Sequence, residues 1–433
     1  MPQIRFLQNK VLHNGLVANV PAAKKTVINW SVILTGLLFQ NGLNAVSLIL
    51  VARQVPPVAY GQYLATYSLV SFLVILPGFG MDAWLLTQPQ LTSDSTTALW
   101  FSTFRIRTIF LIIWGVLMAI LSILLPKTTY PFSLIYPTII GVSFDALTLL
   151  AYASLRTQNR HILVAVVQSF ASIILFALVL SLPINQTYVS SFAFGRMVLS
   201  IGVSLVTVYI MGKDHIGRSL QLTTMRQILI SSRPFLSSEL AASVYIKADV
   251  TILSLMIGSA ATAVYGPAIN ILQAFNLVTI ALFYLIVPRI SKTFITQRSH
   301  FLSQSLTQLI VQAITGLILS IIMWLLASCL VIYIFGAEYN ESIKIIRFLS
   351  PIPFLRSLNF GLAAIIIAGN RQKSRSKIQT FAAIFNVLGN ILIIGILGVT
   401  GVSIMFDLSE LFLVIGYSYL LIDIIHTIKN ETQ

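Results

Sequence analysis

Three cations stand inside stretches of the chain that are otherwise apolar: Arg196, Lys247 and Arg356. A guanidinium presents a planar fork of N–H donors that binds two oxygens of one phosphate, and an ammonium adds a compact positive charge. Placing such groups in apolar surroundings is costly unless they face a partner or a cavity. These residues therefore indicate a cavity that binds an anionic group such as a phosphate.

Three acids occupy similar apolar surroundings: Asp249, Asp407 and Glu410. Asp407 and Glu410 are three residues apart, so a helix would place both carboxylates on one face. Carboxylates inside membrane segments act as proton relays and cation sites. We therefore predict that these three acids bind a coupling ion, H⁺ or Na⁺.

Lys247 and Asp249 are two residues apart, which is about 200° around a helix, so they cannot share a face. At an offset of 205 residues, this stretch aligns with residues 42–44, beside Asn41 and including Asn44. Polar groups that face lipid are costly. We therefore predict that Asn41 and Asn44 line the same cavity as the three cations.

A second interpretation of these charges stays open. At an offset of 211 residues, Asp145 aligns with Arg356, and Arg196 aligns with Asp407. Each half of the chain would then hold one ion pair, Asp145 with Arg196 and Arg356 with Asp407. In that case the charges would join helices instead of binding a substrate.

The elements that position these residues must be membrane-spanning helices. The chain has 433 residues, 57% of them hydrophobic and 9% charged, whereas soluble proteins are about 25% charged. This composition excludes a soluble enzyme and a disordered chain. Because one span needs about 20 apolar residues, we predict an all-α integral membrane protein with twelve spans, at about 27–51, 60–87, 106–125, 131–154, 162–182, 187–211, 233–257, 261–287, 306–335, 346–369, 378–398 and 401–425.

The basic residues alternate between the two sides of these spans. The net charge is +15, but only Arg53, Lys127, Lys344 and Arg347 fall on one side, while most Lys and Arg fall on the other. Basic connections stay in the cytoplasm, so both termini are predicted to be cytoplasmic. Membrane topology therefore explains the positive charge without a nucleic-acid partner.

Two short motifs recur in the second half of the chain. Tyr60-Gly61 matches Tyr265-Gly266 at an offset of 205, and Asn159-Arg160 matches Asn370-Arg371 at an offset of 211. The echoes indicate two six-helix lobes related by a pseudo-two-fold axis, with the substrate site between them. The predicted parts are a cytoplasmic segment 1–26, an N-lobe 27–211, a basic linker 212–232, a C-lobe 233–425 and a cytoplasmic tail 426–433.

Motifs of covalent chemistry are missing from the sequence. Cys329 is the single cysteine, so an intramolecular disulfide is impossible, and the five His are scattered. The GxxxxGK[ST] motif of ATP-binding loops, HExxH and GxSxG do not occur. We therefore expect no catalytic residue, no metal and no cofactor, and a protein that is not an enzyme.

Several motifs in order along the chain resemble a known family. In the first half they are residues 51–63 (VARQVPPVAYGQY) and 76–82 (LPGFGMD). In the second half they are the stretch from Asp249 through YGPA at 265–268 to VPRIS at 287–291, then FGAEY at 335–339 and AGNR at 368–371. Together they resemble the polysaccharide-exporting flippases (the Wzx or O-antigen translocase type) of the multidrug/oligosaccharidyl-lipid/polysaccharide exporter superfamily.

The resemblance implies a two-lobed MATE/MOP-like fold in the inner (cytoplasmic) membrane. It implies ion-coupled alternating access that moves a polyprenyl-pyrophosphate-linked oligosaccharide across this membrane, for O-antigen, capsule or exopolysaccharide biosynthesis. The implied partners are this anionic lipid-linked oligosaccharide, membrane lipid and other membrane proteins of polysaccharide assembly.

Two alternatives stay open. A multidrug or cation antiporter of the same superfamily would have carboxylates, not cations, dominating its cavity. A membrane polysaccharide polymerase would carry a long polar loop on the outer side, whereas the longest connection expected there is near 335–344.

Overall fold

The structure is a computed structural model that describes residues 36, 39–87, 93–158, 160–212, 222–296, 298–369 and 371–432. These residues form helices joined by short connections, with no strands among them. The predicted segment 1–26, the beginning of the first predicted span and residues 213–221 of the predicted linker lie outside the described residues.

The helices follow the predicted spans in order. The first half contains a helix over 39–54, then α3 (Pro57–Leu73), α4 (Ile75–Gly78), α5 (Met81–Leu86), α6 (Ser93–Leu124), α7 (Phe132–Thr157), α8 (His161–Ser181) and α9 (Tyr188–Gly212). The second half contains α10 (Leu222–Met256), α11 (Ser259–Thr296), α12 (Arg298–Leu325), α13 (Ala327–Cys329), a π-helix (Leu330–Phe335), a 3₁₀ turn (Ala337–Tyr339), α14 (Glu341–Leu349), α15 (Ile352–Ala368) and α16 (Gln372–Thr432). Residues 222–232, which the sequence predicted to be linker, form the beginning of α10.

Nine helical stretches of the described residues are long and apolar enough to cross a membrane. The last of them is α16, which turns sharply at Gly398 (φ 56°, ψ −136°) and so contains the two predicted spans 378–398 and 401–425. Two further helices of the described residues correspond to predicted spans. They are the helix over 39–54 and α10, and charged residues interrupt the apolar run of α10. The prediction of an all-α membrane protein with about twelve spans is confirmed.

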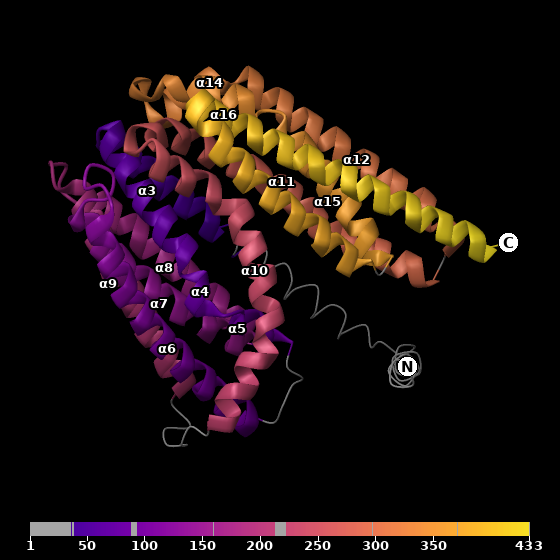
Figure 1. The fold of residues 1–433 in the computed structure, drawn as a ribbon, viewed down its shortest axis with the longest axis horizontal. Coiled ribbons are helices and arrows are strands. Elements are labelled where there is room, and N and C mark those ends of the chain that lie inside the picture. The colour runs from indigo at the N-terminus through magenta and orange to yellow at the C-terminus, as the bar shows by residue number, and fades with distance from the viewer. Residues whose placement is uncertain are drawn as a thin grey trace.

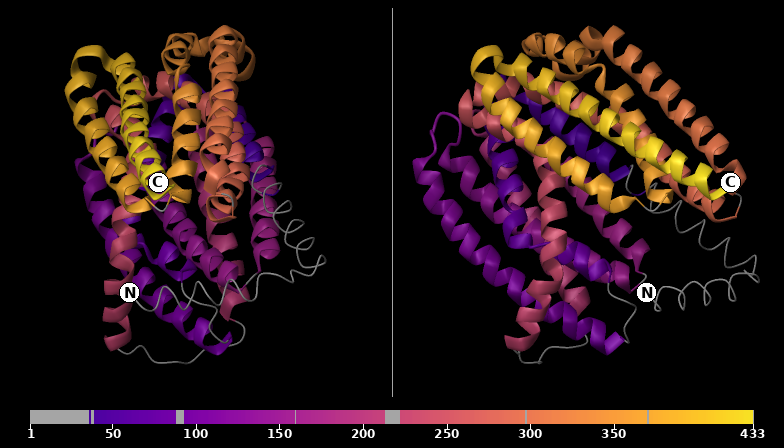
Figure 2. Two further views of the ribbon diagram at one scale, coloured as in Figure 1. Left: turned by 90° about the vertical axis from the view of Figure 1, so that its right-hand side faces the viewer. Right: turned by 45° about the vertical axis from the view of Figure 1, so that its right-hand side comes forward.

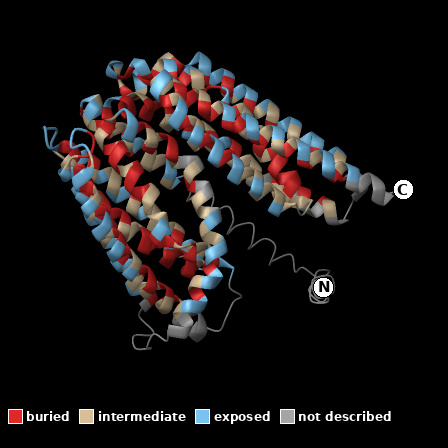
Figure 3. Ribbon diagram, viewed as in Figure 1, coloured by how far each residue is buried: buried red, intermediate tan, exposed pale blue. Residues whose placement is uncertain are grey.

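The helices form two arms that meet at one end and diverge at the other (Figures 1 and 2). One arm contains α3 to α9, the other contains α11, α12, α14, α15 and α16, and α10 lies between them. Exposed residues run along the outer surfaces of the helices (Figure 3). Many of the exposed residues are large and apolar, including Leu124 at 80% and Ile396 at 81% exposure. Exposed apolar area of this extent is stable in lipid and not in water, which agrees with two lobes embedded in a bilayer.

The repeated Tyr-Gly motifs meet where the arms converge. A methyl group at Gly61 of α3 would collide with the carbonyl oxygen of Ser259 and lie 2.9 Å from the backbone nitrogen of Ala263, in α11. A methyl group at Gly266 of α11 would in turn collide with the side chain of Leu64, in α3. The absence of Cβ atoms therefore lets α3 and α11 approach closely, and this contact closes the convergent end.

The second predicted span, 60–87, is not one helix. The chain takes left-handed conformations at Phe79 (φ 49°) and Gly80 (φ 70°), so α4 ends and α5 begins there. A methyl group at Gly80 would lie 2.7 Å from the carbonyl carbon of Phe235 and collide with the backbone nitrogen of Leu236, both in α10. The break therefore docks α5 tightly on α10.

Replacing Gly80 with alanine is expected to destabilise the protein. The left-handed conformation costs a residue with a Cβ about 1–2 kcal/mol, and the collision with the backbone of α10 adds to this. Thermal unfolding of the purified protein in detergent measures the effect. Gly202→Ala is the matched control, because a methyl group there has nothing within 4 Å; equal unfolding temperatures for the two variants would contradict the prediction.

Candidate functional site

The two charges of α10 point to different arms. The Lys247 ammonium donates to the carbonyl oxygen of Ser71, in α3, at 3.0 Å. The Asp249 carboxylate accepts a hydrogen bond from the Asn390 amide, in α16, at 2.7 Å. The prediction that these two side chains occupy opposite faces is confirmed, and α10 presents a cation to one arm and an acid to the other.

Arg196 of α9 is held by two tyrosines of α3. Its guanidinium donates to the hydroxyl oxygens of Tyr63 at 2.6 Å and Tyr67 at 2.9 Å, and it lies 4.2 Å from the centre of the Tyr67 ring. Tyr63, Tyr67 and Ser71 follow at intervals of four residues, so they share one face of α3. This face brings Arg196 and Lys247 together from different helices.

The third predicted cation lies in the other arm. The Arg356 guanidinium, in α15, forms a salt bridge with Glu410 of α16 at 2.6 Å. The amide of Asn359 also donates to the Glu410 carboxylate, at 2.7 Å. Glu410 is almost fully buried, with 1% of its side chain exposed, so its charge is balanced inside the protein.

Neither alternative ion pair named from the sequence is a direct salt bridge among the described residues. Arg356 pairs with Glu410 and not with Asp407, because the two acids lie on one face and Glu410 is the nearer. Arg196 bonds to tyrosines, and the salt bridges of the described residues do not join it to Asp145. The Asp145 carboxylate nevertheless interacts with the Arg196 charge at longer range. One Asp407 carboxylate oxygen is buried without a hydrogen-bond partner among the described residues.

A chain of polar groups surrounds the buried Asp249. The Asn390 amide donates to Asp249 and also to the side-chain oxygen Oδ1 of Asn386 at 3.1 Å, and the Asn386 amide donates to the Ser409 hydroxyl at 3.2 Å. Carboxylate, amide and hydroxyl oxygens are the ligands that hard cations prefer. A group of three His, Cys, Asp or Glu residues that could hold a metal does not occur in the described part of the chain.

Among the hydrogen bonds of the described residues, Asn41 and Asn44 do not bond to Arg196 or Lys247. On the helix over 39–54, Asn41 is exposed and Asn44 is half-buried. The hydrogen bonds of Arg196 and Lys247 go to α3 instead. The assignment of Asn41 and Asn44 to a substrate cavity stays a prediction.

Sequence reasoning missed five polar residues of the site: Tyr63, Tyr67, Asn359, Asn386 and Asn390. Two pairs among them are recognisable in the sequence by their spacing. Tyr63 and Tyr67 are four residues apart within an apolar helix, and so are Asn386 and Asn390. Side chains at this spacing lie side by side on a helix. Polar pairs at this spacing in an apolar helix could therefore have indicated the polar faces of α3 and α16.

Removing the Glu410 carboxylate alone is expected to destabilise the protein more than removing the whole pair. Glu410→Ala leaves the Arg356 charge without this partner in a largely buried place, which costs about 3–5 kcal/mol. The double variant Arg356→Met/Glu410→Leu removes both charges and is expected to recover most of the loss. Thermal unfolding measures the stability of both variants. An equal loss of stability in the two would show that leaving the Arg356 charge without Glu410 has no extra cost.

Comparison with known proteins gives a family and a fold. A family model described as polysaccharide biosynthesis protein matches residues 26–294. The "Putative O-antigen transporter" of Escherichia coli (strain K12) is 29% identical over 175 residues, which are 39% of this chain and 41% of that protein. The alignment thus spans less than half the length of that relative.

Two solved structures share the fold. Lipid II flippase MurJ in an inward closed conformation has a TM-score of 0.73 at 13% identity, covering 92% of this chain and 89% of that one. An inward-facing multidrug resistance MATE family transporter of the MOP superfamily has a TM-score of 0.72 at 13% identity, covering 94% and 99%. The prediction of a MATE/MOP-like two-lobed fold is confirmed.

Proposed function

Because the chain belongs to the polysaccharide biosynthesis protein family, we propose that it is a flippase for a lipid-linked oligosaccharide. Its substrate would be a polyprenyl-pyrophosphate-linked repeat unit of a surface polysaccharide, moved across the inner (cytoplasmic) membrane. The O-antigen relative and the shared fold with a lipid II flippase support this proposal.

The observation that carries the proposal is the convergence of Arg196 and Lys247 on one face of α3. Arg196 belongs to one arm and Lys247 to the helix between the arms (Figure 1). Their hydrogen-bond partners are neutral tyrosine hydroxyls and a backbone carbonyl, so these direct contacts add no negative charge. The Asp145 carboxylate acts on Arg196 from beyond salt-bridge distance and balances at most one of the two cations. An anionic pyrophosphate supplies the missing charge, whereas a cationic drug would be repelled.

The proposed orientation places the diverging end of the arms in the cytoplasm. The basic connections and both termini would then be cytoplasmic, as the distribution of Lys and Arg favours. The N-lobe (27–211) and the C-lobe (233–425) would rock against each other, while the lipid tail stays in the bilayer. This movement requires no covalent chemistry.

The proposed coupling ion is H⁺ or Na⁺, bound by Asp249 with contributions from Asp407 and Glu410. Asp249 and its asparagine partners offer several oxygens in a buried place. Glu410 is the weaker candidate, because Arg356 already neutralises it. Other membrane proteins of polysaccharide assembly would supply the substrate and receive the product.

The test is transport in liposomes by the purified protein. Outward movement of a short-chain polyprenyl-pyrophosphate oligosaccharide is compared for wild type, Arg196→Ala, Lys247→Ala, Arg356→Ala and the exposed control Arg53→Ala. We expect Arg196→Ala and Lys247→Ala to lose at least about tenfold in rate, which corresponds to about 1.4 kcal/mol in the activation free energy of transport. Full transport by both variants would show that Arg196 and Lys247 have a structural role only. Export of cationic dyes by the wild type, without oligosaccharide transport, would support the multidrug antiporter.

A further inference from the structure

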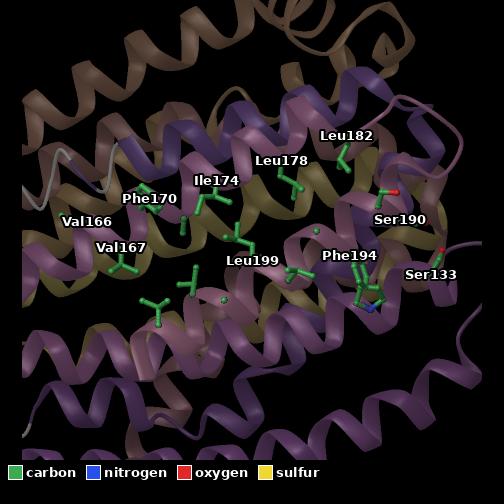
Figure 4. Close-up of a pocket in the computed structure, with 18 residues that line it drawn as sticks. Ser133, Val166, Val167, Phe170, Ile174, Leu178, Leu182, Ser190, Phe194 and Leu199 are labelled. Atoms are coloured by element: carbon green, nitrogen blue, oxygen red, sulfur yellow. The ribbon is translucent and has the colours of Figure 1, made fainter. Parts of the chain in front are cut away.

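An apolar groove of about 1110 Å³ runs between α8 and α9 on the outside of the first arm (Figure 4). Its walls are stripes of side chains at helical spacing, including Phe170, Ile174 and Leu178 on α8 and Phe194 on α9. Several of these are widely exposed, such as Phe170 at 63% and Phe194 at 57%. The groove faces the region that lipid occupies.

The groove stays open because small residues of α9 leave space beside α8 unfilled. A side chain at Gly202 would have nothing within 4 Å, whereas one at Gly195 would meet Leu178 at 2.7 Å, where the helices touch. The first helix does not cover the groove at its described end, since Gly36 lies against Ala165, which is not among the lining residues. The space between the stripes is thus open to the bilayer.

The length of the groove selects its occupant. It follows α8 from Val166 to Leu182, which is about 24 Å at a rise of 1.5 Å per residue. One leaflet is about half of the 30 Å hydrocarbon core, so an ordinary acyl chain would fill only part of the groove. A chain longer than one leaflet is needed to fill the rest.

We propose that this groove binds the polyprenyl chain of the lipid-linked substrate; the inference rests on the proposed function. Ser133 and Ser190 lie at the end opposite Val166 (Figure 4). This end is where the arms converge, because α7 and α9 begin there. The serine hydroxyls mark where the phosphate-bearing end leaves the groove for the polar interface.

The test is photolabelling of the full-length protein in liposomes. The probe is a long-chain polyprenyl-pyrophosphate oligosaccharide with a diazirine near the free end of its chain, and labelled peptides are identified by mass spectrometry. We expect labelling of the groove-facing residues of α8 and α9, reduced about tenfold in Gly202→Trp, which fills the groove; this corresponds to about 1.4 kcal/mol of binding. Gly395→Trp is the matched control, because this exposed helical glycine of α16 also has nothing within 4 Å of its added side chain.

Three results would overturn the inference. They are labelling elsewhere, equal labelling in Gly202→Trp and wild type, or equal labelling of the groove by a diazirine-bearing phosphatidylglycerol. The last would assign the groove to ordinary membrane lipid. Transport of the short-chain substrate is measured in the same liposomes, so a protein that transports it without groove labelling refutes the groove alone, and a protein that transports nothing refutes the proposed function.

Discussion

Replacing Gly61 with alanine is expected to slow transport at least about tenfold and to open the end where the two arms meet. The added methyl group would collide with the backbone of α11 at Ser259 and Ala263. Backbone atoms in a helix cannot turn aside as a flexible side chain can, so the closed contact becomes strongly unfavourable. A free-energy difference of about 5.5 kcal/mol is enough to reverse a 99:1 ratio between two conformations. A transporter that stays in one conformation cannot complete its cycle, so transport stops.

Distances between spin labels test this expectation. Labels are attached to cysteines introduced at two exposed positions, together with Cys329→Ser. One is Thr187, directly before α9, and the other is Glu338, in the 3₁₀ turn that precedes α14. In Gly61→Ala the label-to-label distance should lengthen, while in Gly395→Ala it should match wild type. Gly61→Ala protein that keeps the wild-type distance and transport rate would show that close contact of α3 and α11 is unnecessary.

Replacing Asp249 with asparagine is expected to abolish the dependence of transport on an ion gradient. The substitution keeps the shape of the side chain, and its carbonyl oxygen can still accept the hydrogen bond from Asn390. It removes the buried negative charge that a coupling ion would neutralise. Gradient-driven transport should therefore fall at least about tenfold, in the range seen when ligand shells of metal sites are changed, while the protein stays folded.

The measurement compares transport with a Na⁺ gradient, with a pH gradient and with neither. Asp423→Asn is the matched control, because this acid is half exposed and pairs with Arg371 near the end of α16. Loss of the response to one gradient in Asp249→Asn alone identifies the ion. A full response in that variant to the gradient that drives wild type would remove Asp249 from ion coupling.

The sequence alone predicted most helices, because charged and turn residues separate apolar runs of span length. It also predicted the opposite directions of Lys247 and Asp249, which follow from helix geometry and which the structure confirms. It did not predict the break at Phe79 and Gly80, although the Gly-Phe-Gly stretch is visible at 78–80. Left-handed backbone there depends on docking against α10, a contact between distant parts of the chain.

Partner choice inside the membrane could not be predicted. By their spacing in the sequence, Asp407 and Glu410 are equally suited to pair with Arg356. Only the packing of α15 on α16 brings the Glu410 carboxylate to 2.6 Å from the Arg356 guanidinium. Arg196 faces two tyrosines that look in the sequence like any aromatic residues of a span. The α8–α9 groove was also missed, because residues that line a lipid-facing groove have the same composition as those on a flat lipid-facing surface.

The position of α10 has a consequence for how the polypeptide could be divided. Ile228 and Phe235, near the beginning of α10, pack in one apolar cluster with Met81 and Trp84 of α5, while Asp249 bonds to α16. A chain cut between Gly212 and Leu222 would yield two fragments. The C-terminal fragment would carry α10, and the N-terminal half of α10 fits the surface of the other fragment at α5. Co-produced fragments would thus have complementary surfaces for reassembly, and a cut after Met256 would instead leave the Asp249 side chain without its asparagine partner until the pieces rejoined.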